Sequence, residues 1–502
     1  MPGPMAKSCH RRTCDESNQG PQKGFPVTNN PLNSESHSPF DPAQSLINRM
    51  SGALSRRDVL RAAGTSLGAA IVASATPLWA APAKSRPKVA VVMTVCHHRS
   101  HAHVLLENFL QPYLFNGKRT DPGVDVVSFY VDQTPADDMS QDIARQFKIP
   151  IFKTIAEALC LGGQQLAVDA VLGIGEHGNY PLTKLGQRKY PRKRFFDEIV
   201  AVMRRSRRYV PLFNDKHLSY RWDWAKEMYD TAQQAGIPFM AGSSVPLAQR
   251  RPQLELPAGA HIEEAISIHG GPLESYDFHG LEVLQSMVES RTGGETGVSS
   301  IELLKGDALW KAAEEGRWSP ELARAALAAE LGRAPESLRG IPGEKPEPTL
   351  ALLVTYKDGL KATVLNVGHS STRWNFACRL KSDPKIHATS FYVGPWNNRN
   401  LFKALSHSIQ HHFIHKQAPY PVERTLLVTG MLEAAMRSHD VGKPIQTPHL
   451  EFAYKPRDFT AMREMGASWK IITEDLPEPK GITPHGIGAS LATIPTGIDH
   501  QD

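Results

Sequence analysis

The sequence predicts an α/β protein in which a doubly wound parallel sheet is followed by an α+β domain with a large, mostly antiparallel open sheet. From Lys88 to Ser244, unbroken apolar segments alternate with amphipathic helices, as expected of parallel strands that are buried on both faces. After about residue 246, short strands, tight turns and flanking helices replace this alternation. The length of 502 residues, with 41% apolar and 22% charged residues, suffices for two or three globular domains.

The first domain, residues 84–245, is expected to contain five strands separated by helices. The predicted strands are 88–95, 124–133, 168–177, 209–217 and 237–244. A helix that begins near Trp222 should end at Gly236, because glycine readily adopts the left-handed conformation that closes a helix. Parallel strands end at one edge of their sheet, so the polar residues that follow them should meet there and form a ligand site. Those residues are Cys96 to His103, Asp132, Gln133, Glu176, His177 and Asp215 to His217.

The second domain, residues 246–472, is expected to contain a hairpin around Asp358-Gly359 and a final helix within residues 423–439. A charged, alanine-rich stretch at 308–346 has helical periodicity and several prolines, and is interpreted as an excursion from the sheet. Residues 473–502 are rich in Pro and Gly and are predicted to form a flexible tail.

The N-terminal region predicts export. Residues 1–49 lack apolar periodicity and are predicted to be disordered or misannotated, with translation starting at Met50. In residues 50–83, Arg56 and Arg57 precede a run of small apolar residues that ends in Ala81-Pro82-Ala83, which resembles a twin-arginine (Tat) signal peptide. The alternative is a membrane helix or an N-terminal core helix, against which the weak hydrophobicity and Pro77 argue. The Tat translocon is therefore the expected export partner, and the periplasm the expected location.

Charge and cysteine content exclude other classes of protein. The 57 Lys and Arg against 51 Asp and Glu give a net charge of +6, spread along the chain, which gives no support for nucleic acid binding. Five cysteines without close pairs fit neither a disulfide framework nor a thiolate metal site. The histidines His97, His98, His101 and His103 could suggest a metal site, but no carboxylate or thiolate stands at a suitable spacing, so we predict no metal.

Four segments resemble the glucose-fructose oxidoreductase/inositol dehydrogenase (Gfo/Idh/MocA) family. They are IARQFKIPIFKTIAEAL, VDAVLGIGEHGNYP, the run from PLFNDKH to IPFMAGSS, and FHGLEVLQSMVE. Together they extend from about Lys88 to Ser290. The resemblance implies an N-terminal Rossmann-like dinucleotide-binding domain and a C-terminal domain whose open sheet often serves as a homo-oligomer face. It also implies NAD(P)-dependent chemistry on a carbohydrate-like small molecule.

The resemblance implies a set of cofactor-binding residues, and the sequence departs from the family pattern in one of these segments. Arg99, Ser100 and His101 occupy the turn and helix start that would hold the diphosphate, although the glycines usual there are missing. Asp132 would accept hydrogen bonds from the adenosine ribose, which favours NAD over NADP. Glu176 and His177 would line the nicotinamide side, and Lys216 would contact the nicotinamide as well as the substrate.

Lys216, His279 and Asp277 are the predicted catalytic residues. Lys216 matches the lysine of the family's Glu-Lys-Pro motif, here Asp215-Lys216-His217, and burial at a strand end could tune its pKa. His279 lies on the helix that supplies the family's catalytic histidine. The usual aspartate partner four residues earlier is replaced by Ser275, so Asp277 is the nearest carboxylate. The non-catalytic alternatives are that Lys216 is a surface lysine in a loop and that His279 is a partly buried structural histidine.

The sequence thus leads to three hypotheses. The first is an exported NAD(P)-dependent oxidoreductase that moves hydride to or from a sugar, a polyol or a related hydroxy compound. The second is an NAD-dependent glycosidase or lyase of the same fold. The third is a divergent member that has lost the dinucleotide and binds a small ligand, or a metal, at its histidine-rich edge. The missing glycines favour this third hypothesis most directly.

Overall fold

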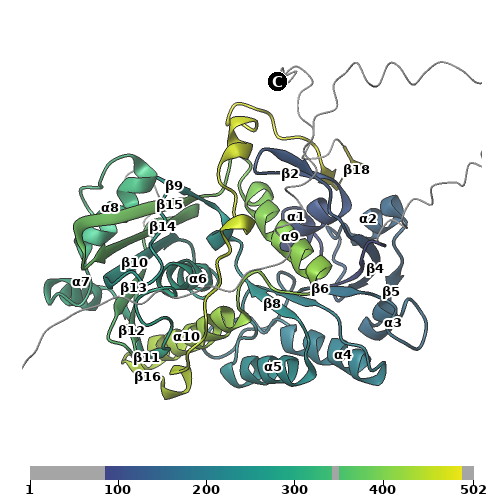
Figure 1. Ribbon diagram of the computed structural model, residues 1–502, viewed down its shortest axis with the longest axis horizontal. Coiled ribbons are helices and arrows are strands. Elements are labelled where there is room, and N and C mark those ends of the chain that lie inside the picture. The colour runs from purple at the N-terminus through teal and green to yellow at the C-terminus, as the bar shows by residue number, and fades with distance from the viewer. Residues whose placement is uncertain (1–84, 342–349, 485, 489–502) are drawn as a thin grey trace, which may run out of the picture. The chain divides into compact units, whose positions relative to one another are not determined.

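A parallel sheet of six strands forms the centre of the first domain (Figure 1). The structure is a computed structural model that describes residues 85–341, 350–484 and 486–488. Its sheet order is β5-β4-β1-β6-β7-β8, and all neighbouring strands are parallel. The strands are β1 (Lys88–Met93), β4 (Asp125–Val131), β5 (Ile151–Phe152), β6 (Ala170–Ile174), β7 (Leu212–Asp215) and β8 (Phe239–Gly242). This order places a topological switch point between β1 and β6, where doubly wound sheets bind ligands.

Helices cover both faces of this sheet because successive side chains of a strand point to opposite faces. In β1, Val89, Val91 and Met93 pack with α1 and α2, whereas Ala90 and Val92 pack with α3, α4 and α5. These helices are α1 (His101–Leu110), α2 (Ser140–Phe147), α3 (Ile155–Cys160), α4 (Arg192–Arg205) and α5 (Trp222–Ala235). Gly236 closes α5 with a φ of 64°, as predicted. The predicted doubly wound sheet is confirmed.

A second sheet of eight strands, in the order β16-β11-β12-β13-β10-β14-β15-β9, forms the second domain. Only its β10–β13 pair is parallel, so the predicted mostly antiparallel sheet is confirmed. Asp358-Gly359 joins β12 to β13, as predicted. The strands are β9 (Gln249–Arg251), β10 (Ile262–Gly270), β11 (Val298–Lys305), β12 (Leu350–Tyr356), β13 (Lys361–Asn366), β14 (Ser370–Leu380), β15 (Asp383–Tyr392) and β16 (Ile445–Gln446).

Helices also cover both faces of the second sheet (Figure 1). On one face lie α6 (Asp277–Val288) and α10 (Val422–Val441), the latter being the predicted final helix. On the other face, α7 (Asp307–Glu314) and α8 (Pro320–Leu331) pack on apolar residues of β10, β12 and β14. The stretch interpreted as an excursion is therefore a layer of the domain. Homo-oligomerisation through this sheet stays a prediction.

One long helix, α9 (Asn398–His415), lies in sequence between β15 and β16 of the second sheet, yet it packs against α1 and the hairpin β2–β3 of the first domain (Figure 1). The sequence reasoning did not predict this helix. The described part of the expected tail, through Gly488, also returns to α1. The short elements are β2 (Tyr113–Phe115), β3 (Lys118–Thr120), η3 (Val245–Leu247), η4 (Pro448–Leu450), η5 (Thr460–Met462), η6 (Ala467–Lys470), β17 (Ile482–Thr483) and β18 (Gly486–Ile487).

The predicted signal peptide and the residues before it lie outside the described part of the chain. Among the helices that the structure does describe, none combines the length and hydrophobicity needed to cross a membrane.

Candidate active site

The carboxyl edge of the parallel sheet brings together most of the predicted site residues. Glu176 lies just beyond β6, Lys216 directly follows β7, and His101 opens α1. The Nδ1 of His101 donates a hydrogen bond to Oδ2 of Asp215 at 2.7 Å. The ring of His177 meets that of His101 edge-on, with 5.1 Å between the ring centres. The parallel arrangement of the strands, which the sequence predicted, produces this convergence.

Lys216 is held by a buried ion pair. Its Nζ donates to Oε1 of Glu176 at 2.8 Å, while the other oxygen of Glu176 accepts a hydrogen bond from Arg192. Lys216 and Glu176 are each 6% exposed, and Arg192 is 1% exposed. Lys216 also has a φ of 63°, a left-handed backbone conformation that is rare for a residue with a long side chain and is often found at functional sites.

The ion pair keeps both partners charged. Burial alone would raise the pKa of Glu176, but Lys216 and Arg192 hold it well below its usual range. Burial alone would lower the pKa of Lys216, but the Glu176 carboxylate raises it above the ordinary lysine value. At neutral pH Lys216 is therefore an ammonium that donates hydrogen bonds, and it is not a neutral base.

His279 lies on the first turn of α6, on the second domain's side of this edge. Its Nδ1 is 2.6 Å from Oγ of Ser243, which also accepts a hydrogen bond from the backbone N–H of Val245. Burial, together with the positive charges of Lys216 and His101, holds the pKa of His279 well below its usual range. The ring is therefore uncharged at neutral pH, and one of its nitrogens can accept a proton.

Asp277 does not lie against the His279 ring. One of its oxygens is 3.1 Å from Nε2 of His269, and the other accepts a hydrogen bond from the backbone N–H of Glu274 at 2.8 Å. Both contacts fix the start of α6, so the structure gives Asp277 a positioning role in place of the predicted acid–base role. Ser243, which the sequence reasoning missed, takes the place beside His279.

A polar cavity of about 420 Å³ lies where the two domains meet. Its walls include Arg99 from the turn after β1, Tyr276 at the start of α6 and Asn398 at the start of α9. The Tyr276 ring stacks on Trp374 at 5.0 Å and lies edge-on to the His279 ring at 6.3 Å. Tyr276 therefore stands between the cavity and His279.

Asp132, the predicted ribose ligand, is bonded to three neighbours. Its oxygens accept hydrogen bonds from the hydroxyls of Tyr130 and Tyr180, both at 2.6 Å, and from Arg194. Next to it, the Gln133 side chain donates to the backbone oxygen of Asn179 at 3.0 Å and accepts from its N–H at 2.8 Å. These bonds, which we call the latch, join the loop after β6 to the end of β4 across the end of β1.

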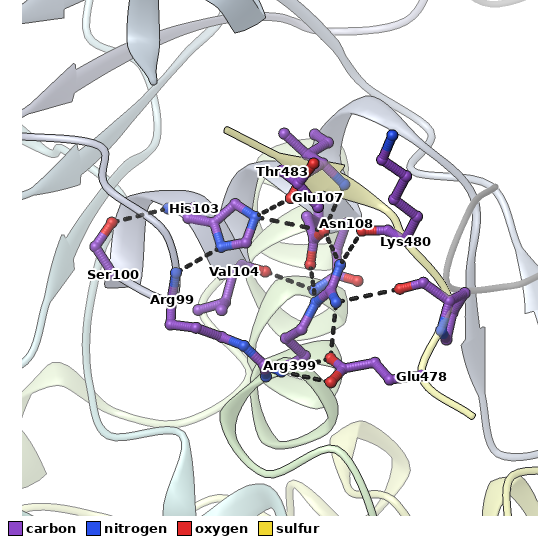
Figure 2. Close-up of polar contacts among 12 residues, drawn as sticks. Arg99, Ser100, His103, Val104, Glu107, Asn108, Arg399, Glu478, Lys480 and Thr483 are labelled. Atoms are coloured by element: carbon purple, nitrogen blue, oxygen red, sulfur yellow. Dashed lines mark hydrogen bonds and ion pairs between the residues drawn. The ribbon is translucent and has the colours of Figure 1, made fainter. Parts of the chain in front are cut away.

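Two of the three residues expected to hold a diphosphate, Arg99 and Ser100, also have partners within the chain (Figure 2). The Arg99 guanidinium donates to both oxygens of Glu478, at 2.7 and 2.5 Å, and to the backbone oxygen of Trp396 at 3.1 Å. The Ser100 hydroxyl caps α1 by accepting a hydrogen bond from the backbone N–H of His103. Neither side chain is free to bind a ligand in this arrangement.

A buried polar cluster beneath Ser100 was also missed from the sequence (Figure 2). Glu107 on α1 pairs with Arg399 on α9, whose Nε is 2.8 Å from Oε2, and its Oε1 accepts a hydrogen bond from the backbone N–H of Ile482 at 2.8 Å. The Nε2 of His103 contacts the backbone oxygen of Ile482 at 2.7 Å. The available signal was a glutamate on the apolar face of α1, since a buried carboxylate requires a partner.

The crevice at the switch point is therefore narrow. The rings of His97, His101 and His177 gather there, with 5.1 Å between the centres of His97 and His177. A Cβ atom on Gly178 would lie 2.9 Å from Oε1 of Gln133, which shows how closely the loop after β6 is seated. In this arrangement the residues do not fit a diphosphate. Across the described segments, no group of three or more His, Cys, Asp or Glu side chains is arranged to hold a metal ion.

No protein-family model matches the chain, and no curated protein matches it. Among solved structures, GenD2 from gentamicin A biosynthesis, in complex with NAD, is 12% identical and covers 72% of this chain and 96% of its own, with a TM-score of 0.47. Scyllo-inositol dehydrogenase from Lactobacillus casei, with bound NAD(H) and scyllo-inositol, is 10% identical, with 72% and 99% coverage and a TM-score of 0.45. A probable dehydrogenase from Thermotoga maritima is 9% identical, with 72% and 99% coverage and a TM-score of 0.43. The solved structures similar to this chain thus include inositol dehydrogenases and GenD2.

Proposed function

We propose that this protein is an oxidoreductase that acts on a hydroxyl group of a sugar, a polyol or a related small compound, with an NAD-type dinucleotide as its cofactor. The observation that supports this most strongly is the convergence of a charged Lys216 and an uncharged His279 at the carboxyl edge of the parallel sheet. An ammonium that donates a hydrogen bond and an imidazole that accepts a proton are the two groups that proton transfer at an alcohol requires.

The two residues have different roles in this proposal. Lys216 donates a hydrogen bond to the substrate oxygen and stabilises negative charge there, while Glu176 keeps the ammonium charged and in place. His279 exchanges the hydroxyl proton through Nε2, because its Nδ1 is engaged by Ser243. Glu176 and Ser243 act through their partners, so both are positioning residues.

The neighbouring cavity suits a compound with several hydroxyl groups. Besides Arg99 and Tyr276, its walls include Ser371, Thr372 and Asn397. Hydroxyl and amide side chains can both donate and accept hydrogen bonds, which matches the groups of a polyol. The volume of about 420 Å³ is in the range of small-molecule sites.

Binding of a dinucleotide would require the loop after β6 to move away from the end of β4. A dinucleotide would need the bonds that join Asp132 and Gln133 to Asn179 and Tyr180 to separate, after which the Asp132 carboxylate would be free to accept hydrogen bonds from a ribose. We therefore propose that cofactor binding is coupled to opening of the latch.

A second candidate function is favoured by the closed crevice itself. In this alternative the protein keeps the fold, binds a small hydroxylated ligand beside Tyr276 and uses no dinucleotide. The bonded state of Asp132, Arg99 and Ser100 supports it, because each of these groups is already satisfied within the chain. The NAD-dependent glycosidase or lyase hypothesis stays a prediction.

Two measurements separate these candidates. The full-length protein is purified from cytoplasm and denatured, its supernatant is analysed by mass spectrometry for NAD(P), and the intact protein is titrated with NAD and NADP. Released or saturably bound dinucleotide, with NADH formed when inositols or sugars are added, supports the oxidoreductase. Absence of both release and binding leaves the cofactor-free candidate. Cleavage of aryl glycosides without net NADH formation would indicate the glycosidase.

Export through the Tat pathway to the periplasm is a separate proposal, based on Arg56, Arg57 and the apolar run after them. The tagged protein should appear in the periplasm of a wild-type host and stay in the cytoplasm of a host without the Tat translocon. N-terminal sequencing of the precursor tests the Met50 start, and a peptide from residues 20–45 would contradict it.

A further inference from the structure

A cavity of about 590 Å³ lies in the second domain at the end of α6 away from His279. Its walls come from the segment after β9, from the last turn of α6 and from residues 456–465. His279 of the candidate active site and Met287 in the wall of this cavity both lie on α6, eight residues apart. Eight residues of helix correspond to about 12 Å along the helix axis. None of the proposed catalytic residues lines this cavity, so it is a site of its own.

Two buried arginines in its wall share one carboxylate. Arg250 is 6% exposed and Arg463 is 2% exposed. Nη1 of Arg250 donates to Oε2 of Glu255 at 2.9 Å, and Arg463 donates to both oxygens of Glu255, at 2.9 and 2.7 Å. The side chain of Glu255 is 43% exposed, so solvent weakens its compensation of the two charges.

The chain leaves part of this positive charge uncompensated. The Nε atoms of Arg250 and Arg463 are both buried without a hydrogen-bond partner. Burial and the neighbouring Arg463 also lower the pKa of Arg250, which is the signature of a cation that its surroundings disfavour. Over the whole wall, four arginines face three carboxylates: Arg250, Arg291, Arg457 and Arg463 against Glu255, Glu289 and Asp458.

Two of these seven charges are compensated elsewhere. Arg291 pairs with Glu295 and Asp358, and Glu289 pairs with Arg424. The remaining charges are three arginines against Glu255 and Asp458. Arg457 donates to the backbone oxygen of Ala418 at 3.0 Å and stands exposed at the rim. The cavity therefore has a net positive wall, which attracts anions.

Other residues of the wall are apolar. They include Leu256, Pro257, Ile262, Met287 and Phe459. From the cationic and apolar walls together, we infer that this cavity binds an organic anion, in which a carboxylate or phosphate group faces the arginines and an apolar body contacts the rest of the wall. Neither an inorganic ion nor a neutral polyol would satisfy both walls.

The test uses the full chain and two pairs of probes, one pair that differs in charge and one that differs in the apolar body. Benzoate and benzamide have the same shape, and phenyl phosphate and inorganic phosphate share the anionic group. In calorimetric titrations we expect benzoate to bind saturably and at least about tenfold more tightly than benzamide, because a charged hydrogen bond outweighs a neutral one. We expect phenyl phosphate to bind at least about tenfold more tightly than inorganic phosphate, because only its phenyl ring contacts the apolar wall. Equal binding of benzoate and benzamide, or no binding of either anion, would overturn the inference.

Three variants then locate the site. Glu255→Gln should tighten binding of both organic anions about tenfold, since it removes the carboxylate that competes for Arg250 and Arg463. Arg457→Met at the rim should weaken binding several-fold, because one attractive charge is lost. Arg379→Met, on β14 and paired with Glu321 outside the cavity, is the matched control and should leave affinity unchanged. Misfolding cannot imitate the gain expected for Glu255→Gln, and unchanged affinity in that variant would contradict the site.

Discussion

Lys216 and Glu176, which were predicted separately as site residues, form a buried ion pair on which the proposed chemistry depends. Lys216→Ala should cut turnover by at least about 10², the lower range for loss of a group that acts in proton transfer. Arg192 still compensates Glu176 in this variant, so most of the protein should fold. Steady-state kinetics together with circular dichroism checks both expectations. Tyr229→Phe, which removes a hydroxyl bonded to Glu423 on a distant helix, is the control. Unchanged turnover in Lys216→Ala would remove Lys216 from the mechanism.

His279 should stay uncharged throughout the physiological range. Its pKa lies well below 6.5 because of burial and the charges of Lys216 and His101, so lowering the pH from 8 to 6.5 should not protonate the ring. Nuclear magnetic resonance of ¹⁵N-labelled histidine measures this directly. Ser243→Ala removes the Nδ1 partner and should lower kcat more than it raises KM, with a shifted pH profile. A His279 that titrates near 6.5 in the folded protein would contradict the proposed role.

At the residue scale, the sequence predicted the site residues that lie at the carboxyl ends of parallel strands or just after them. Lys216, Glu176, His101 and His177 were identified because parallel strands deliver their carboxyl ends to one edge. Ser243 was missed because its contact with His279 joins two domains. No local pattern reports such a contact. Asp277 was assigned to His279 because it is the nearest carboxylate in sequence, whereas the fold turns its oxygens to His269 and to the backbone N–H of Glu274.

At the scale of elements, Gly271 allows Tyr276 to take its place at the start of α6. A Cβ atom at position 271 would lie 2.0 Å from Cδ1 of the Tyr276 ring, which is itself stacked on Trp374. Gly271→Ala should therefore displace the ring and raise KM for the substrate about tenfold or more, with a loss of roughly 1–3 kcal/mol in the free energy of unfolding. Gly259→Ala, where nothing lies within 4 Å of a Cβ, is the matched control for removal of a glycine. It has a φ of 76°, so it should cost stability without affecting KM. A wild-type KM in Gly271→Ala would show that Tyr276 does not contact the substrate.

The contact between α1 and α9 should contribute strongly to stability. Arg399→Met leaves Glu107 buried without its ion-pair partner and should lower the free energy of unfolding by about 3 kcal/mol. Arg86→Met removes a surface pair with Asp125, in which the Arg86 side chain is 41% exposed, and should cost less than about 1 kcal/mol. Urea denaturation compares the two variants. Equal losses would contradict a special contribution of the buried pair.

Elements that depend on distant contacts were the ones that the sequence did not predict. The strands of the first sheet followed from their apolar runs, and α5 followed from its spacing and from Gly236. By contrast, α9 has buried polar residues such as Lys403 and Gln410 among its apolar ones, which obscures the periodicity. Residues 478–483 are held near α1 by ion pairs of Glu478 with Arg99 and Arg399. Arg99 is 379 positions from Glu478 in the sequence and Arg399 is 79 positions from it, so no local pattern predicts these contacts.

At the scale of the whole molecule, buried histidines should make the fold sensitive to acid. Burial lowers the pKa of His177 to about 3 and of His407 and His412 to about 4. Between these values and the unfolded value of about 6.5, the unfolded chain binds protons that the folded chain does not. Stability should therefore fall as the pH drops from 7 towards 4, by at most about 1.4 kcal/mol per pH unit for each of these groups. Thermal unfolding across this range measures it, and a flat profile between pH 7 and 5 would contradict the burial of these rings.

The two-domain plan was predictable because it rests on the change of pattern near residue 246. The packing of α7 and α8 on the second sheet could not be predicted, because the sequence of an alanine-rich helix does not indicate which surface the helix packs on. Trp318 and Leu327 are fully buried against that sheet, so α7 and α8 are part of the core.

The most direct test of the account is a titration of the intact protein with NAD, compared with Tyr180→Phe. This substitution removes the hydroxyl that bonds Asp132 and so weakens the latch, while Tyr130 and Arg194 remain in place. The account predicts saturable NAD binding to the wild type and binding about tenfold tighter in Tyr180→Phe, since one hydrogen bond to a charged group no longer has to break. No NAD binding to either protein, with both folded, would contradict the proposed redox function and leave the cofactor-free candidate.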